Sequence, residues 1–192
     1  MKKGGGLRRR WMTNTVSIIC ALGLVFATLI TAVFAVYYYS NLEADLRYRA
    51  RTTTEFFAGY INLNYNEYYQ SCITYAQTFD DRDMLELQFI DAQGKIVASS
   101  YGQWMTQSPT TPEIGDAVST RSIRSFTGAD PCTGERIMAV SSPMIYSNGE
   151  VIGVLRYVTS TRKVDFQIFW VAVLSVGAQV IMLVVVLLSS GY

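Results

Sequence analysis

Residues 84–100 read MLELQFIDAQGKIVASS, and this stretch decides the fold. From Leu85 to Phe89, apolar and polar side chains alternate, as they do in a strand with one buried face. The turn-forming sequence DAQG at residues 91–94 follows and leads into a second short run, Lys95–Ser100. The stretch therefore predicts a β-hairpin.

Three more strands are expected after this hairpin. The sequence predicts them at Ser122–Phe126, Arg136–Tyr146 and Val151–Ser160, and the SNGE sequence at 147–150 suits the turn between the last two. A loop with two prolines comes before them, and a short helix is expected at Ile114–Thr120. The region is thus expected to hold about five antiparallel strands.

A long helix is expected before the hairpin. The segment Asn41–Phe79 contains no Pro and only one Gly, Gly59. Its apolar and aromatic residues recur in steps of three, four and seven, which is the period of one helix face. We expect this face to pack on the sheet, to form a dimer seam through Leu42, Leu46 and Thr53, or to do both along different lengths.

Two long uncharged stretches flank this region, from Trp11 to Leu42 and from Phe166 to Tyr192. Each holds a 21-residue apolar core, which as a helix reaches about 32 Å and so crosses a hydrocarbon core of about 30 Å. The first core is longer than the apolar region of a cleaved signal peptide, so we expect an uncleaved anchor. Transmembrane helices are predicted at 15–39 and 166–190.

Together these elements predict an α+β fold: a long N-terminal helix packed on an antiparallel sheet of about five strands, flanked by two transmembrane helices. The tail at 1–14 holds five cations and no acid, which places it in the cytoplasm and residues 40–165 outside the cell membrane. We expect this basic tail to be a topological signal and membrane lipid to be a partner, with no nucleic acid bound.

The composition argues against an enzyme. The 192 residues include no His, which excludes His-dependent catalytic triads, most zinc hydrolases and a phosphorylated His within this chain. The acids Asp80, Asp81 and Asp83 lack the glycine and closing glutamate of an EF-hand calcium loop. We expect no catalytic residues, no metal site and no cofactor.

Two stretches resemble the extracytoplasmic Cache (PAS-like) sensor domain of bacterial receptors, namely residues 84–100 and residues 130–160, DPCTGERIMAVSSPMIYSNGEVIGVLRYVTS. The shared features are the strand–DxxG–strand opening, the D-P-x-T-G-E turn, the Ser142-Pro143 break, and an Asn-Gly turn before Ile-Gly-Val-Leu. The resemblance covers about residues 40–162 and implies a PAS-like sheet.

The arrangement resembles the input half of a membrane-bound sensor histidine kinase. The resemblance implies that the chain detects an extracytoplasmic signal and passes it through both transmembrane helices. The sequence stops at Gly191-Tyr192, where the output domain of such a receptor would begin, so we expect the natural protein to be longer. The alternatives are the input domain of a chemoreceptor or other transmembrane receptor, and a membrane-anchored adaptor that binds an envelope protein. A homodimer is expected.

The resemblance to Cache domains implies a small ligand bound between the sheet and the loops over it, or a domain that has lost this role, and it directs attention here to residues 101–126. Arginines beside aromatic side chains suit a carboxylate ligand, so a small anion is the expected ligand class. Arg156, on the last strand, is a further residue that could face the same space. The alternative is that the arginines are solvated or paired with acids. The candidate ligand-binding residues are Tyr101, Trp104, Arg121, Arg124 and Tyr146.

The chain has three cysteines. Cys20 lies in the first expected span, whereas Cys72 and Cys132 lie in the region expected outside, where disulfides form. Cys72 and Cys132 are a candidate disulfide, with two free thiols as the alternative.

Overall fold

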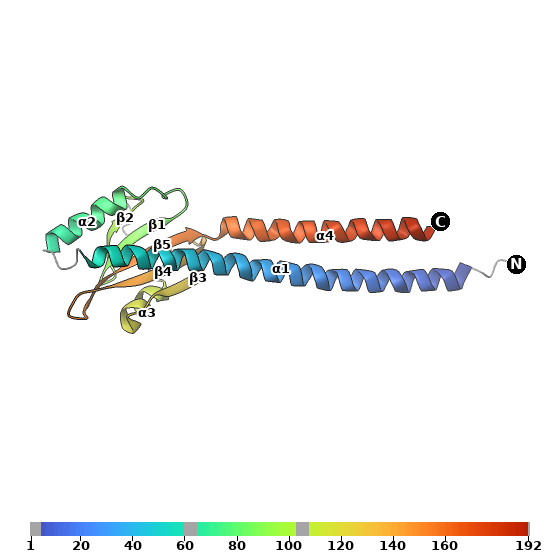
Figure 1. Ribbon diagram of the computed structural model, residues 1–192, viewed down its shortest axis with the longest axis horizontal. Coiled ribbons are helices and arrows are strands. Elements are labelled where there is room, and N and C mark those ends of the chain that lie inside the picture. The colour runs from blue at the N-terminus through green and yellow to red at the C-terminus, as the bar shows by residue number, and fades with distance from the viewer. Residues whose placement is uncertain (1–4, 60–64, 103–107, 192) are drawn as a thin grey trace. The chain divides into compact units, whose positions relative to one another are not determined.

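The computed structural model describes residues 5–59, 65–102 and 108–191 (Figure 1). Its elements are α1 (Gly5–Ala58), α2 (Tyr65–Gln77), β1 (Glu86–Asp91), β2 (Ile96–Ser99), α3 (Pro112–Thr120), β3 (Arg124–Ala129), β4 (Arg136–Ile145), β5 (Val151–Ser160) and α4 (Arg162–Gly191). The chain divides into two compact units. The globular unit is Ser40–Arg162, and the two-helix unit is Met1–Tyr39 with Lys163–Tyr192.

The five strands form one antiparallel sheet in the order β2-β1-β5-β4-β3. Both expected hairpins are present, and β5 has the predicted bounds. The strand expected at Ser122–Phe126 begins and ends later, because α3 extends to Thr120 and Arg121 caps it in the left-handed conformation, with φ of 50°. The structure confirms the predicted α+β fold with a five-stranded antiparallel sheet.

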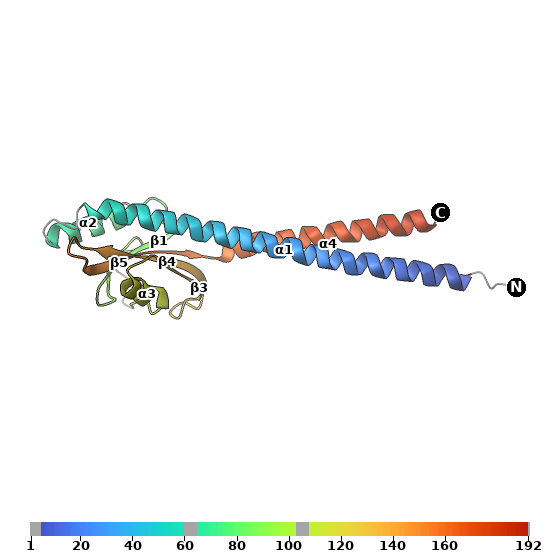
Figure 2. The same ribbon diagram turned by 60° about the horizontal axis from the view of Figure 1, so that its bottom comes forward.

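In the globular unit, α1 covers one face of the sheet and α3 lies on the other (Figure 2). Leu46, Ala50 and Phe57 of α1 are fully buried. The Phe57 ring packs edge-on against Phe89 of β1, with ring centroids 5.0 Å apart. One hydrophobic core therefore lies between α1 and the sheet, as the helical spacing of the apolar residues predicted. A second cluster, of Ile90, Ile114 and Val154, lies between the sheet and α3.

The dimer seam expected through Leu42, Leu46 and Thr53 is wrong for two of its three residues. Leu46 is fully buried inside the globular unit, and Thr53 is 6% exposed. The Thr53 hydroxyl forms a 2.9 Å hydrogen bond with the hydroxyl of Tyr157 on β5. The hydrogen bond between Thr53 and Tyr157 holds α1 on its own sheet. Leu46 and Thr53 are therefore not accessible to a second copy of the chain.

The single helix expected over Asn41–Phe79 is also corrected. α1 ends at Ala58, immediately before Gly59, whose backbone freedom makes it a poor helix former. Residues 60–64 lie outside the described part of the chain, and α2 begins at Tyr65 as a separate helix that packs beside β2 and β1. The expected apolar stripe continues on α2, where Cys72 is fully buried.

The two-helix unit contains two helices long and apolar enough to cross a membrane, within Asn14–Ala58 and Arg162–Leu188. Their large apolar side chains point outward, Phe26 and Val33 on α1 and Leu174 on α4 being examples. Outward-facing apolar side chains on long helices suit a lipid environment. These helices fit a membrane protein with two spans.

Candidate functional site

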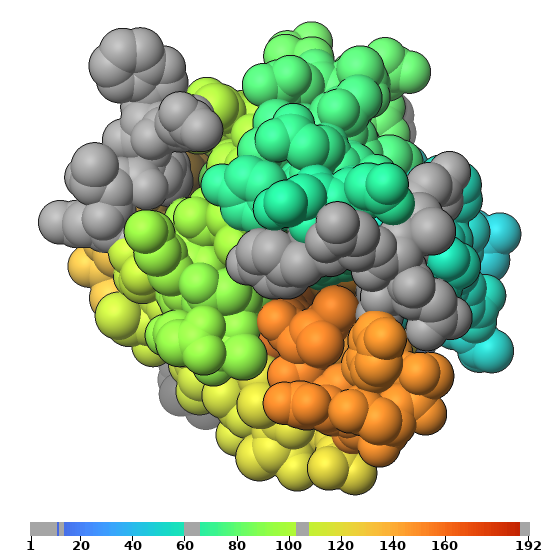
Figure 3. Space-filling view, turned by 90° about the vertical axis from the view of Figure 1, so that its left-hand side faces the viewer, coloured from blue at the N-terminus to red at the C-terminus, as the bar shows by residue number. Residues whose placement is uncertain are grey.

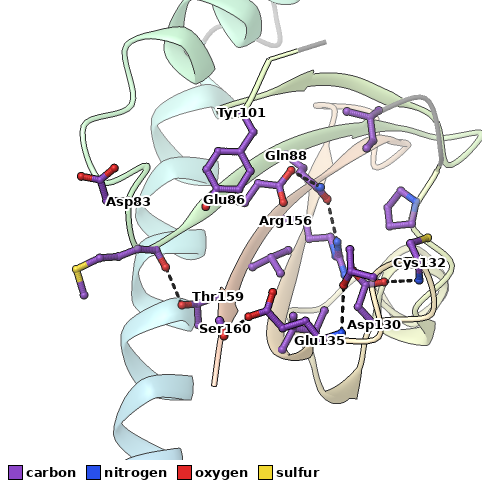
Figure 4. A pocket seen from close by; sticks show the side chains of 16 residues that line it. Asp83, Glu86, Gln88, Tyr101, Asp130, Cys132, Glu135, Arg156, Thr159 and Ser160 are labelled. Carbon is purple, nitrogen blue, oxygen red and sulfur yellow. Dashed lines mark hydrogen bonds between the residues drawn. The ribbon is translucent and has the colours of Figure 1, made fainter. Parts of the chain in front are cut away.

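A cavity of about 500 Å³ opens on one face of the sheet (Figure 4). Phe89 on β1 and Tyr157 on β5 pack toward the helix side of the sheet, where they contact Phe57 and Thr53 of α1. Because successive side chains on a strand point to opposite faces, the neighbours Gln88 and Arg156 point away from α1. The cavity, called here the sheet-face cavity, is lined by Asp83, Met84, Glu86, Gln88, Ile96, Tyr101, Pro109, Asp130, Cys132, Thr133, Glu135, Ile137, Arg156, Val158, Thr159 and Ser160.

Arg156 is at the back of this cavity and is only 2% exposed. Its Nε donates to Glu113 Oε1 at 2.9 Å, its Nη1 to Gln88 Oε1 at 2.9 Å, and its Nη2 to Thr111 Oγ1 at 2.8 Å. Gln88 stands opposite Arg156 in the β1–β5 register, while Glu113 and Thr111 come from the start of α3. The network therefore anchors α3 to the two central strands of the sheet.

Glu86 is the next polar residue along β1 on the same face and is 8% exposed. Its Oε1 accepts hydrogen bonds from Gln88 Nε2 at 2.7 Å and from Ser99 Oγ at 2.9 Å. Among the described residues, no hydrogen bond reaches its other carboxylate oxygen. Glu86 thus presents a buried carboxylate to the cavity with one oxygen unused.

The β3–β4 turn forms the opposite wall of the sheet-face cavity. The Asp130 carboxylate accepts hydrogen bonds from the Cys132 main-chain N–H at 2.9 Å and from the Thr133 hydroxyl at 3.3 Å. Gly134 has a φ of 70°, a left-handed backbone conformation that residues with a side chain rarely adopt. Glu135 then accepts a 2.6 Å hydrogen bond from the Ser160 hydroxyl at the end of β5. The turn is therefore tied to the end of the strand that leads into α4.

Tyr101, in the loop after β2, lines the same cavity and is 50% exposed. Burial of its ring raises the pKa of the Tyr101 hydroxyl. The carboxylates of Glu86, Asp83 and Glu135 raise this pKa further, in that order of size. Three carboxylates therefore lie close enough to the Tyr101 hydroxyl to act on it.

The structure brings together only part of the predicted ligand site. Tyr101 lines the sheet-face cavity, whereas Trp104 lies outside the described residues. Arg121 caps α3 and is exposed, and Arg124 at the start of β3 donates from Nε to Thr120 Oγ1 at 3.1 Å on the surface. Neither arginine lines either of the two cavities described here. The arginine at the cavity is Arg156.

Tyr146 lines a different cavity, of about 400 Å³. Figure 3 shows the end of the globular unit at which α2 and the turns of the two hairpins come together. This end cavity also has Tyr68, Tyr69, Asp91 and Glu150 in its lining. Tyr146 and Tyr101 are therefore separated in the structure, because the turn that carries Tyr146 lies at the opposite end of β5 from Ser160.

The candidate disulfide is not formed, since Cys72 and Cys132 are both free. Cys72 is buried on α2, and this burial raises the pKa of its thiol to about 12. Cys132 is exposed in the β3–β4 turn. Among the described residues, no group of three His, Cys, Asp or Glu side chains is placed to hold a metal ion.

Sequence reasoning missed Glu86, Gln88, Asp130 and Glu135 as lining residues. The polar positions of the first hairpin suggest a solvent-facing side, yet Gln88 is 3% exposed. One sequence signal was available for Arg156, because a lone arginine interrupts an otherwise apolar run in VIGVLRYV. In a central strand with both faces covered, such a residue needs buried polar partners.

Comparison with known proteins identifies the domain type. The family model of the Cache domain of the WalK sensor protein kinase matches residues 74–159. No curated protein sequence gives a significant match.

Three solved ligand-binding domains have a similar fold. The domain of the Campylobacter jejuni chemoreceptor Tlp3 in complex with L-valine has a TM-score of 0.52 and 16% identity, covering 80% of this chain and 66% of that one. The Pseudomonas aeruginosa PAO1 amino acid chemoreceptor PctC in complex with GABA has a TM-score of 0.50 and 16% identity, covering 81% and 68%. The domain of Mlp24 with asparagine has a TM-score of 0.58 and 15% identity, covering 77% and 61%.

The chain thus spans just under two thirds of the Tlp3 chain, and at these identities the likeness concerns the fold. The family match, the five-stranded sheet and the flanking apolar helices agree with one another. The globular unit is an extracytoplasmic-type Cache (PAS-like) sensor domain, similar to the Cache domain of the WalK sensor protein kinase.

Proposed function

We propose that this chain is the input half of a bacterial sensor histidine kinase, whose transmitter follows α4 in the full-length protein. The tail at 1–14 lies in the cytoplasm, the segments 15–39 and 166–190 span the membrane, and residues 40–165 face the outside. A signal received by the Cache domain passes through the two spans. The basic tail and the two apolar helices support this orientation.

The observation that carries the proposal is the junction between β5 and α4. Only Thr161 separates the end of the strand at Ser160 from the start of the helix at Arg162. The Thr161 main-chain N–H donates to the Arg136 carbonyl at 3.0 Å, so the junction is hydrogen-bonded to β4. β5 carries Arg156, Val158, Thr159 and Ser160 of the sheet-face cavity. A shift of β5 is therefore transmitted directly to the start of the second span.

The sheet-face cavity is the proposed receiving site. Its volume of about 500 Å³ falls in the range of small-molecule sites. The Tlp3, PctC and Mlp24 domains are described with L-valine, GABA and asparagine, which are all small molecules. A ligand shifts the β5–α4 junction only if it binds one arrangement of the sheet more tightly than another. An envelope protein bound at the same rim is the second candidate input.

The test is a chimera in which a histidine-kinase transmitter follows α4, reconstituted in nanodiscs. One Ala inserted between Thr161 and Arg162 rotates the helix by about 100° relative to the strand. We expect basal autophosphorylation to change several-fold, with the unfolding midpoint of the globular unit retained. One Ala inserted between Asn148 and Gly149, in the exposed β4–β5 turn, is the control and should leave output unchanged. Equal output from both insertions would contradict transmission through the junction.

Cys132 provides a native reporter of orientation. It is exposed, whereas Cys72 is buried and its raised pKa of about 12 leaves roughly one thiol in ten thousand ionised at pH 8. A membrane-impermeant maleimide should label intact cells at Cys132 alone, and Cys132→Ser should abolish labelling. Labelling of Cys132 only after permeabilisation would reverse the proposed topology.

The homodimer remains part of the proposal, through a different face of α1. Tyr48 is 70% exposed and lies two positions, or about 200° around α1, from the fully buried Leu46. Cysteine crosslinking at Tyr48 should trap a dimer of the full chain in membranes. A cysteine at Leu46 is the control, because that position is fully buried and should not crosslink.

A further inference from the structure

The charges around the sheet-face cavity have mostly one sign. Its lining contains the four carboxylates of Asp83, Glu86, Asp130 and Glu135, and the single guanidinium of Arg156. A cavity wall of one sign concentrates ligands of the opposite charge, because low-dielectric surroundings screen the field less than water does.

The one cation is already neutralised. Arg156 Nε lies 2.9 Å from Glu113 Oε1, and the two side chains are 3% and 0% exposed. Arg156 donates hydrogen bonds to Glu113, Gln88 and Thr111, so that all three nitrogen atoms of its guanidinium group have partners. A carboxylate ligand would have to displace a buried acid to pair with this arginine, which is costly.

Three carboxylates of the lining, by contrast, accept hydrogen bonds from neutral donors. Asp130 accepts from a main-chain N–H and a hydroxyl, and Glu135 accepts from a hydroxyl. Glu86 accepts from an amide and a hydroxyl, both at Oε1, although the residue is 8% exposed. All these donors are neutral, so the hydrogen bonds orient the acids without cancelling their charge. Glu86 in particular is a largely buried carboxylate with one oxygen unused and facing a cavity.

An aromatic ring stands beside these acids. Figure 4 shows Tyr101 next to Glu86 over the cavity, with Asp83 on the far side of the ring. Burial of the ring, followed by the charges of Glu86, Asp83 and Glu135, raises the pKa of the Tyr101 hydroxyl, in keeping with acids close to this ring. An aromatic ring beside a carboxylate can bind an ammonium group, through the cation–π interaction and the ion pair together.

We propose that the sheet-face cavity selects an organic cation, with its ammonium group at Glu86 and its carbon skeleton against Tyr101. This inference rests on the proposed role of the cavity as the receiving site, and it reverses the sign of the ligand expected from Arg121 and Arg124. An organic ammonium suits the site better than a metal ion, because the described acids are not grouped closely enough to form a coordination shell.

The test compares three probes of nearly identical shape, 2-phenylethylammonium, 2-phenylethanol and 3-phenylpropionate, titrated into the full chain in nanodiscs at low salt. We expect the ammonium to bind at least about ten-fold more tightly than the alcohol, and the anion to bind more weakly than both. Glu86→Gln, which keeps the size of the side chain and removes its charge, should weaken ammonium binding roughly ten-fold or more. Glu150→Gln, at the end cavity, has the same change of charge and should leave the Kd unchanged.

A second variant guards against a folding defect in Glu86→Gln. Tyr101 is half-exposed, so Tyr101→Leu should retain the unfolding midpoint of the wild type. It should weaken ammonium binding about two- to five-fold and affect 2-phenylethanol less. Both variants losing affinity for the ammonium probe, with Glu150→Gln unchanged, would support the inference.

Three outcomes would overturn it. If 3-phenylpropionate binds more tightly than the ammonium probe, and Glu86→Gln strengthens its binding further, the ligand is an anion. The cavity would then still be the receiving site. Loss of ammonium binding in Glu150→Gln alone would move the site to the end cavity. Binding of none of the probes at millimolar concentration would also overturn the inference, and the insertion at Thr161–Arg162 would still test the proposed function separately.

Discussion

The side-chain amide of Gln179 on α4 donates a 2.9 Å hydrogen bond to the main-chain carbonyl of Cys20 on α1. Gly23 on α1 makes room for it, since a Cβ at that position would lie 2.3 Å from Gln179 Nε2. Both helices are otherwise apolar in this region, and a polar amide in hydrocarbon without a partner is unfavourable. The pair therefore fixes the register of the two helices in the two-helix unit.

Gly23→Ala should loosen this register. The added methyl group displaces the Gln179 amide, and interhelical hydrogen bonds of this kind contribute about 0.6–2 kcal/mol. Pulsed EPR distances between spin labels on α1 and α4, in nanodiscs, should broaden in the variant. Gly177→Ala is the control, because nothing lies within 4 Å of a Cβ there. An unchanged distance distribution in Gly23→Ala would argue against the register role.

Arg156→Met should destabilise the globular unit by about 3–5 kcal/mol, because it leaves Glu113 buried and unpaired. Denaturant unfolding of the full chain in detergent measures this change. The double variant Arg156→Met with Glu113→Leu should recover much of the loss, since removing both charges avoids the unpaired acid. Arg51→Ala, in the exposed pair with Glu55, should leave the midpoint unchanged. A double variant no more stable than Arg156→Met would contradict this account.

Gly153→Ala should destabilise the sheet by about 1–3 kcal/mol. A Cβ at Gly153 on β5 would lie 2.5 Å from the Ile90 carbonyl oxygen on β1, and main-chain atoms of a paired strand cannot easily move aside. Gly115→Ala on α3 meets open space and should be neutral or stabilising by up to about 1 kcal/mol. Thermal unfolding of the two variants side by side is the measurement. Equal midpoints would show that β5 tolerates a side chain here.

The sheet and the approximate extent of its strands were predictable from the sequence, because local alternation and turn residues determine them. β5 matched its predicted bounds, and the DAQG sequence formed the β1–β2 turn.

The candidate site was less predictable than the sheet. The arginine that faces the cavity, Arg124 or Arg156, is determined by the face of the sheet on which its side chain lies. The spacing of residues in the sequence does not show which face α1 covers and which face α3 covers. The partners of Arg156 come from up to 68 positions away along the chain.

Glu43 gives the prediction on pH. Its carboxylate accepts a 2.6 Å hydrogen bond from Ser125 Oγ on β3 and a 2.8 Å hydrogen bond from Arg47 Nε on α1. The Ser125 hydrogen bond, followed by the smaller effect of Arg47, holds the pKa of Glu43 below its usual value of 4.5. A carboxyl group whose pKa is lowered on folding binds protons more readily in the unfolded chain.

The contribution of Glu43 to stability is therefore fully present above about pH 4.5 and is lost as the pH falls through the lower pKa of the folded state. Glu43→Gln removes this contribution, so the gap in unfolding midpoint between wild type and variant should be constant from pH 7 to pH 5 and narrow below pH 4.5. Thermal unfolding of the full chain between pH 7 and pH 3 measures the gap. Glu67→Gln on the exposed side of α2 has the same change of charge and serves as the control. If the difference in unfolding midpoint widens as the pH falls, the Ser125 hydrogen bond does not favour the ionised carboxylate of Glu43. The contact between α1 and β3 would then depend on Arg47, whose Nη2 donates to Ser125 Oγ at 2.9 Å.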